Sequence, residues 1–394
     1  MTAENPPTSE PSDMPVAAIA GIIATVAVFA ISQGLSYPLL SFILQRQGLS
    51  PAMIGISAAM TPLGFIVSSF FIPALSRHFG AARLALACAA SAALLLAAIA
   101  TWQDVWAWFP LRFLIGFAAN PLYVISETWM IAMAPPARRG RLMGIYASVV
   151  SAGFAIGPLT LTLAGTEGWP PFLVGISAFV LCGAILLAVL PRMPEMRDEK
   201  QPTSVAGFVL VAPLLMFAVF TAAAFEQALL ALFSVYGEAH GSSEQRIATL
   251  LTVFIAGNVV LQIPLGALAE RLGADRVMLL CALFAAAGCA LLPVLLPTVL
   301  IWPVTFVWGA VAFGIYTMGL IQLGEHFSGA MLMTGNAAFA LAWGAGGIAG
   351  PPFTGTVMDL IGVQGLPLAL ALLCGALAAG IVASLSSRRS TAGD

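Results

Sequence analysis

The second half of this 394-residue chain repeats the first half at a constant offset of 193 residues, as from position 48 to position 241. The matches fall on glycines, prolines and polar residues at turns and helix ends, and they align without a gap. They include Gly48 with Gly241, Ser50 with Ser243, Gly80 with Gly273, Arg83 with Arg276, Gly116 with Gly309 and Tyr123 with Tyr316. A repeat of this length predicts two bundles of the same architecture.

Apolar residues make up 60% of the chain and charged residues only 8%. A soluble domain normally carries about 25% charged residues, whereas a membrane-spanning helix needs roughly 20 mainly apolar residues. Twelve such segments are predicted, at 15–43, 50–75, 82–103, 106–133, 141–165, 170–190, 206–236, 246–269, 276–298, 301–323, 330–358 and 365–387. The sequence therefore predicts an all-α membrane protein with twelve transmembrane helices in two pseudo-symmetric six-helix bundles.

A long charged stretch in the interior of the chain, residues 191–205, separates the two halves. We expect it to be a linker between bundles at 15–190 and 206–387. Short tails flank the bundles at 1–14 and 388–394, and the first is polar and Pro-rich, which favours disorder. The remaining loops are short and leave no room for a soluble catalytic domain.

The basic residues predict the orientation in the membrane. Of the 15 Lys and Arg residues, 12 lie in loops or the C-terminal tail on the same side as the linker. The positive-inside rule places that side, and both termini, in the cytoplasm. We expect the membrane to be a bacterial inner membrane. Arg46 and Arg246 are the two exceptions on the outer side, and Arg112 lies inside a predicted helix.

Composition and motifs exclude several other classes. The net charge of −2 indicates no nucleic-acid partner, and the five cysteines lie in predicted spans without metal-ligand spacing. The sequence contains no phosphate-binding loop pattern, so we do not expect ATP to be the energy source. It also contains no cluster of catalytic side chains that would indicate an enzyme. We therefore expect no cofactor and no metal site.

Several segments resemble the major facilitator superfamily. Residues 266–276, which include Glu270, Arg271 and Gly273, are similar to its loop signature Gly-x-x-x-Asp-Arg-x-Gly-x-Arg/Lys. Residues 34–41, 123–129 and 262–266 most resemble its YcaD-type branch. The resemblance implies a twelve-helix secondary transporter in which helices 1, 4, 7 and 10 line a central cavity.

The matching loop in the first half departs from that signature, since Pro73 replaces the first glycine and Arg77 replaces the acid. We expect Glu127 of the fourth helix to supply the missing carboxylate at a cytoplasmic gate. A role of Glu127 in substrate or proton handling remains the alternative. The predicted gate residues are Glu127, Arg77, Arg138, Arg139, Glu270 and Arg271.

One arginine and one glutamate are predicted at similar depth inside the membrane. Arg112 belongs to the fourth helix and Glu226 to the seventh, and the resemblance places both helices at the cavity. A charge inside the bilayer costs several kcal/mol unless it is paired or hydrated. We therefore predict that Glu226 and Arg112 couple transport to protons. A fixed pair that only joins two helices is the alternative.

Polar residues on the same helices are predicted to line a substrate cavity. Arg112, Asn120, Tyr123 and Glu127 share one face of a helix with 3.6 residues per turn. The predicted cavity residues are Gln33, Asn120, Tyr123, Gln227 and Tyr316.

The fifth and eleventh helices share a glycine–proline pattern. Small residues four apart allow helices to approach closely, and proline kinks a helix. In the superfamily the pattern in helix 5 is typical of antiporters and exporters, although close packing explains the glycines equally well. The residues are Gly153, Gly157, Pro158, Gly346, Gly350 and Pro351.

These features predict a secondary active transporter of a small organic molecule that works by alternating access. Proton-coupled antiport, with export of the solute, is the leading hypothesis. Proton-coupled uptake, including uptake of an anionic solute, is one alternative, and a transport-inactive membrane receptor or scaffold is another. The expected partners are the solute, protons and the lipid bilayer, and we expect a monomer.

Overall fold

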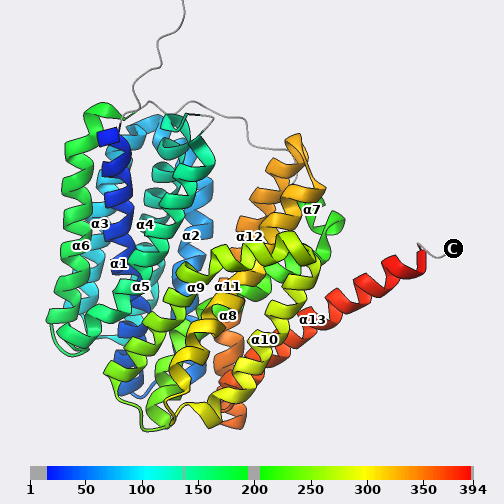
Figure 1. Cartoon of the computed structure of the whole chain (residues 1–394). Coiled ribbons are helices and arrows are strands. Elements are labelled where there is room, and N and C mark those ends of the chain that lie inside the picture. The colour runs from blue at the N-terminus through cyan, green and yellow to red at the C-terminus, as the bar shows by residue number, and fades with distance from the viewer. Residues whose placement is uncertain (1–15, 136–137, 194–204, 392–394) are drawn as a thin grey trace, which may run out of the picture.

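The computed structural model describes residues 16–135, 138–193 and 205–391, and these residues are helical apart from short connections (Figure 1). The first half forms α1 (Val16–Arg46), α2 (Pro51–Phe79), α3 (Ala81–Thr101), α4 (Val105–Met133), α5 (Arg139–Ala164), α6 (Pro170–Val189) and the short 3-10 helix η2 (Leu190–Arg192). The second half forms α7 (Val205–Val211), α8 (Pro213–Ala239), α9 (Glu244–Leu272), α10 (Ala274–Leu295), α11 (Ile301–His326), α12 (Gly329–Ile361) and α13 (Gly365–Thr391).

The predicted all-α membrane fold is confirmed, and eleven of the described helices are long and apolar enough to span a membrane. These eleven do not include α12, the helix that corresponds to the predicted segment 330–358. Its many glycines, together with threonines and prolines, dilute its apolar side chains. Its length of 33 residues still exceeds the roughly 20 that a span requires.

The segment 206–236, predicted as one helix, is two helices, and this corrects the sequence interpretation. Ala212 has φ −134° and ψ 59°, which ends α7 before Pro213 begins α8. Proline has no N–H to continue a helix and disfavours the helical conformation in the residue before it. The short α7 is held by Phe208, which packs in a small core with residues such as Leu323 and Phe339.

The predicted tails and the predicted linker lie wholly or partly outside the described residues. The tail 1–14 and most of the linker 191–205 lie outside the described residues. The predicted C-terminal tail 388–394 begins as helix, because α13 continues to Thr391. This extends the last helix by about one turn.

The sequence repeat is also a repeat of helix packing. A Cβ atom on Gly64 of α2 would overlap the carbonyl oxygen of Phe113 in α4. A Cβ atom on Gly257 of α9 would overlap the carbonyl oxygen of Phe306 in α11, and both pairs of positions differ by 193. The pair α2–α4 in the first bundle therefore matches the pair α9–α11 in the second.

The glycine–proline pattern packs α5 on α1 and α12 on α8. A Cβ atom on Gly153 or Gly157 would overlap the backbone of α1, and one on Gly346 or Gly350 would overlap the backbone of α8. Pro158 and Pro351 are buried in the same helices. These glycines thus allow close contacts inside each bundle.

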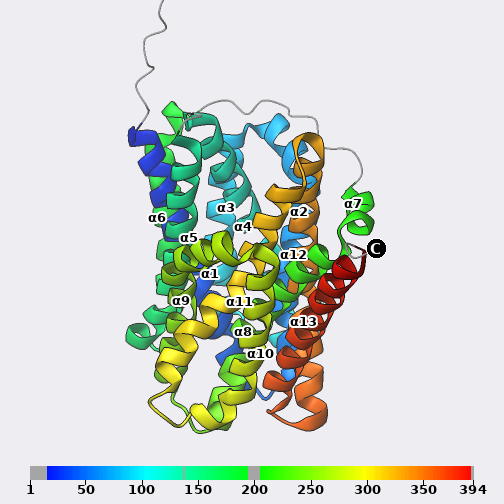
Figure 2. The ribbon, with the colours of Figure 1, turned by 45° about the vertical axis from the view of Figure 1, so that its right-hand side comes forward.

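The two bundles meet through α2 with α12 and through α5 with α9. We call the end where α6 finishes and α8 begins the linker end, and the end with the α1–α2 and α8–α9 turns the far end. Gly55 of α2 lies against Pro351 of α12, and Gly355 of α12 lies against Pro51 of α2. These contacts lie in the half of the molecule nearer the far end. Towards the linker end α12 diverges from the first bundle, and Figure 2 shows the same bundles turned by 45°.

Candidate functional site

Glu226 stands out in α8 because it is partly exposed where its neighbours are not. Residues 221–225 and 227–237 are all buried. The Glu226 side chain is therefore partly accessible to solvent in the middle of an otherwise buried stretch of α8. It forms no hydrogen bond or ion pair with any residue of the described ranges.

Arg112 of α4 is almost fully buried, with 2% of its surface exposed. Its Nη1 donates a hydrogen bond of 3.3 Å to Ser57 Oγ of α2, and its Nε is buried without a hydrogen-bond partner in the described structure. The predicted pair with Glu226 is not formed as an ion pair here. Arg112 thus retains hydrogen-bonding capacity that the described protein does not use.

Tyr37 of α1 lies near both of these groups, and the sequence analysis did not single it out. Its phenol lies within electrostatic range of both Arg112 and Glu226. It is buried, and its ring centroid lies 6.2 Å from that of Phe154 in α5. Its spacing of four residues from Gln33 was the available signal, because residues four apart share one helix face.

Tyr123 and Tyr316, which the repeat relates, both lie within electrostatic range of Glu226. Both side chains are partly exposed. The Tyr123 ring packs edge-on against Phe29 at 4.3 Å, and the Tyr316 ring lies 6.4 Å from Phe339. The two bundles therefore present equivalent tyrosines near the same carboxylate.

Gln33 of α1 and Gln227 of α8 are buried amides in two helices that contact each other. Within the described residues, Gln33 Nε2 and Gln227 Oε1 are buried without hydrogen-bond partners. Leaving a buried polar group unpaired costs about 1–3 kcal/mol, so such groups are usually satisfied by water or a ligand. Their placement agrees with a polar site between α1 and α8.

Asn120, predicted at the cavity, lies in the interface between α4 and α2. Its Nδ2 lies 2.9 Å from Phe65 O, 2.8 Å from Ser68 Oγ and 2.9 Å from Ser69 Oγ. Its amide hydrogens are therefore used to hold two helices of the first bundle together.

The predicted gate residues lie near the linker end. Glu127 is exposed and lies within electrostatic range of Tyr146 and Tyr316. It forms no hydrogen bond or ion pair with the described residues. The remaining predicted gate residues Arg77, Arg138, Glu270 and Arg271 are exposed, and the side chain of Arg139 lies outside the described part of the structure.

The comparisons with known proteins agree with this architecture. Residues 22–215 and 215–393 each match the model of the Major Facilitator Superfamily. The uncharacterized MFS-type transporter YfkF of Bacillus subtilis (strain 168) is 28% identical over 344 residues, which cover 86% of this chain and 88% of YfkF. The uncharacterized MFS-type transporter YcaD of Escherichia coli (strain K12 / DH10B) is 24% identical over 256 residues, which cover 64% of this chain and 66% of YcaD.

A solved structure shares the fold. The crystal structure of the nucleoside transporter NupG matches with a TM-score of 0.77 and 14% identity, covering 93% of this chain and 98% of NupG. At that identity the likeness concerns the fold alone. The family model, however, matches both halves of the sequence. This chain therefore belongs to the major facilitator superfamily, and it is a multi-pass membrane transporter rather than an enzyme.

Proposed function

We propose that this transporter exchanges protons for a small organic solute across the bacterial inner membrane and exports the solute. The observation that carries the proposal is Glu226, a partly exposed carboxyl group in the middle of a helix whose neighbouring residues are buried. Three tyrosines, Tyr37, Tyr123 and Tyr316, lie within its electrostatic range. These groups form a polar site where the bundles meet.

The physical argument for coupling is the cost of enclosing a charge. Alternating access requires the space around Glu226 to close before the other end opens. Enclosing an ionised carboxylate away from water costs several kcal/mol, while a neutral or paired carboxyl group costs much less. Either a proton or a solute that donates hydrogen bonds or carries positive charge must therefore occupy Glu226 before the bundles move. Competition between the two for one carboxyl group produces exchange.

The orientation is part of the proposal. With the linker end in the cytoplasm, as the basic residues predict, the contacts between the bundles near the far end correspond to closure on the outer side. Cysteines introduced at Ser204 in the linker and at Ala239 at the far end should react with impermeant reagents from opposite sides of the membrane. Reaction from the same side would contradict this topology.

The test of exchange begins with the solute. A thermal-shift screen of the purified protein against metabolites and drugs identifies ligands, and nucleosides belong in the library because NupG is a nucleoside transporter. Proteoliposomes are then loaded with the hit and with a pH-sensitive dye, and diluted into solute-free buffer. Under antiport, solute efflux draws protons inward and the lumen becomes acidic. A lumen whose pH does not change while solute leaves contradicts proton coupling.

Proton-coupled uptake of an anionic solute is the second candidate, because Arg112 is a buried cation with an unpartnered Nε. A carboxylate or phosphate on the solute would match a guanidinium group. The same experiment separates the two candidates, since symport would carry protons out with the solute and make the lumen alkaline.

A further inference from the structure

Arg46, one of the two arginines that the positive-inside rule does not explain, joins the two bundles at the far end. It is the last residue of α1. Its guanidinium forms a salt bridge with Glu244, the first residue of α9 in the other bundle. Its Nη1 also donates to Thr166 Oγ1 at 2.9 Å, and its Nη2 donates to the Thr166 carbonyl oxygen at 2.6 Å.

Thr166 completes a closed set of bonds with these two residues. It is 4% exposed and lies just beyond the end of α5. Its hydroxyl donates to Glu244 Oε2, so the carboxylate is held by one residue from α1 and one from the α5–α6 connection. Both belong to the first bundle. Separation of the bundles at this end must break all of these bonds to Glu244.

A second carboxyl group of the other bundle lies near the same cation. Glu238, near the end of α8, lies within electrostatic range of Arg46 and of Glu244. Its Oε1 is buried without a hydrogen-bond partner in the described structure. One guanidinium of the first bundle therefore lies near two acidic residues of the second.

A separate contact, between α12 and α2, joins the two bundles at the same end of the molecule. Asp359, near the end of α12, accepts a hydrogen bond of 3.3 Å from the backbone N–H of Ala52 in the first turn of α2. This contact also joins opposite bundles. A carboxylate at the start of a helix is favoured by the free N–H groups and the dipole of that helix.

The repeat relates the two contacts. Thr166 and Asp359 are 193 residues apart, and so are Ser50 and Ser243, which precede α2 and α9. In each case a residue at or just beyond the end of one helix, α5 or α12, binds the first turn of a helix in the opposite bundle. The charges differ, because the position equivalent to Arg46 is Ala239. Of the two contacts that the repeat relates, only the one at Glu244 therefore includes an ion pair with this arginine.

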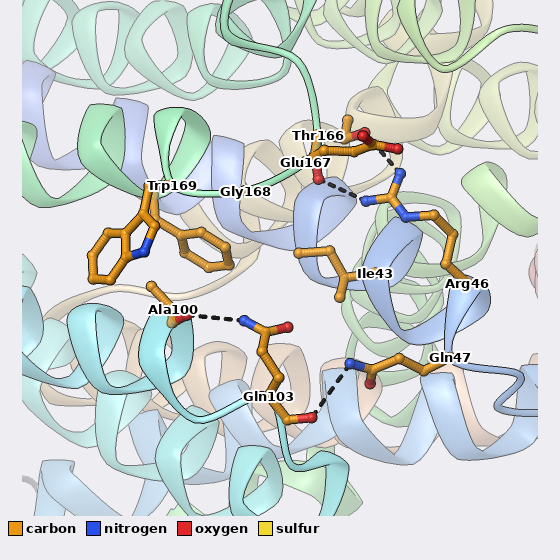
Figure 3. Close-up of a pocket in the computed structure, with 10 residues that line it drawn as sticks. Ile43, Arg46, Gln47, Ala100, Gln103, Thr166, Glu167, Gly168 and Trp169 are labelled. Carbon is orange, nitrogen blue, oxygen red and sulfur yellow. Dashed lines mark hydrogen bonds between the residues drawn. The ribbon is translucent and has the colours of Figure 1, made fainter.

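Water reaches the ion pair. Figure 3 shows the Arg46 guanidinium turned towards Thr166 at the edge of a cavity of about 440 Å³, which is lined by residues such as Gln103 and Trp169. The side chains of Arg46 and Glu244 are 32% and 29% exposed. An ion pair with this exposure contributes modestly on its own.

We propose that Arg46, Thr166 and Glu244, together with the contact of Asp359 of α12 with the first turn of α2, form a two-point latch that closes the far end and must open for the solute to pass. The latch rests on the proposed function, since it gives alternating access its outer gate. It assigns a role to Arg46 and Asp359 that no motif indicates.

Spin-label distances test the latch without any solute. One label pair at Thr101 and Thr298 reports the far end, and a second pair at Arg83 and Arg276 reports the linker end, all four positions being exposed. The five native cysteines are buried, which limits background labelling. The readout is the distance distribution in reconstituted protein, so it is independent of proton coupling.

Loss of the latch should open the far end. We expect Arg46→Ala and the isosteric Glu244→Gln each to raise the population with the longer Thr101–Thr298 distance by about two- to fivefold. The linker-end distance should shorten in step. Adding Asp359→Asn to Arg46→Ala should raise that population further. Glu244→Gln keeps the test valid if Arg46→Ala does not fold.

Two matched controls use residues that act within one bundle. Arg246 also lies at the far end, but its Nη2 donates to the Leu296 carbonyl oxygen of its own bundle at 2.7 Å. Asp104 caps its own helix by accepting from the N–H of Trp106 at 3.2 Å. Arg246→Ala and Asp104→Asn should leave both distance distributions unchanged.

The latch is overturned if the latch variants leave both distributions as in the wild type, or if Arg246→Ala changes them as much as Arg46→Ala. A latch that behaves as expected while the solute moves without protons would refute proton exchange and leave the latch standing. Unchanged distances with intact proton exchange would refute the latch alone.

Discussion

Gly116 of α4 lies so close to Thr61 of α2 that a Cβ atom at position 116 would overlap the Thr61 carbonyl oxygen. A Cβ atom on Gly309 of α11 would likewise overlap the carbonyl oxygen of Phe254 in α9. Positions 309 and 254 lie 193 residues after positions 116 and 61. Gly116 is one turn from Arg112, so this contact positions the helix that carries the buried guanidinium. The first prediction follows from the absence of space for a methyl group.

Gly116→Ala should lower the thermal stability of the purified transporter, because overpacking against a backbone oxygen costs about 1–3 kcal/mol. Thermal unfolding followed by intrinsic fluorescence measures the effect. Gly375→Ala is the matched control, since a Cβ atom at that position of α13 would meet nothing within 4 Å. Its stability should be unchanged or slightly raised. Equal losses in both variants would contradict the packing argument.

Gly55→Leu should prevent the far end from closing. Gly55 lies against the backbone of Pro351 and Pro352 across the bundle boundary, where a leucine side chain does not fit. We expect the label pair at the far end to report a longer distance. Gly266→Leu in α9 is the control, because position 266 has open space around it. A wild-type distribution in Gly55→Leu would show that α2 and α12 can close without this contact.

Glu226→Gln should abolish transport driven by a pH gradient and leave solute exchange partly intact. Glutamine keeps the size of the side chain and can still form hydrogen bonds, but it takes up no proton. Solute flux in proteoliposomes, with and without a pH gradient, measures both activities. Glu325→Gln, which changes an exposed acid near the end of α11, should behave as wild type. Full pH-driven accumulation in Glu226→Gln would place the coupling site elsewhere.

Arg112→Ala should lose both pH-driven accumulation and exchange, because the solute or Glu226 loses its cationic partner. The control is Ser57→Ala, which removes the acceptor that Arg112 Nη1 contacts at 3.3 Å. If Arg112 acts on the solute or the proton, Ser57→Ala should retain most of the flux. If the two variants lose flux equally while remaining folded, Arg112 only joins α4 to α2.

Glu127→Gln should favour the inward-open state. We expect Glu127 to bind a basic residue such as Arg77 or Arg138 only when the linker end closes, and glutamine would weaken that bond. The label pair at the linker end should then report a larger population at the longer distance. Glu325→Gln again serves as the control. An unchanged distribution would remove Glu127 from the gate.

The sequence was sufficient for the fold class because spanning a membrane is a local requirement. A segment without water around it must satisfy its backbone hydrogen bonds within itself, so apolar length alone indicates a helix. The break at Ala212 was missed although Pro213 marks it, because the apolar composition continues through it. The short α7 is a helix because Phe208 finds a buried site against distant segments.

The candidate site was predicted in part. Periodicity placed Tyr123 and Asn120 on one face of α4, and both face inward. Periodicity does not say which neighbour a side chain meets. Asn120 meets α2, whereas Tyr123 lies within range of Glu226. Tyr37 required knowledge of how α1 lies relative to α4 and α8.

The sequence by itself determined the helical fold class, the two-bundle repeat and the family, because apolar length, a constant offset and the family's motifs are all present along the chain. Only the tertiary structure decided which polar groups meet. Arg46 and Glu244 are 198 residues apart, and Ala52 and Asp359 are 307 apart. Such contacts depend on how two bundles are placed against each other. No local pattern of residues contains that placement.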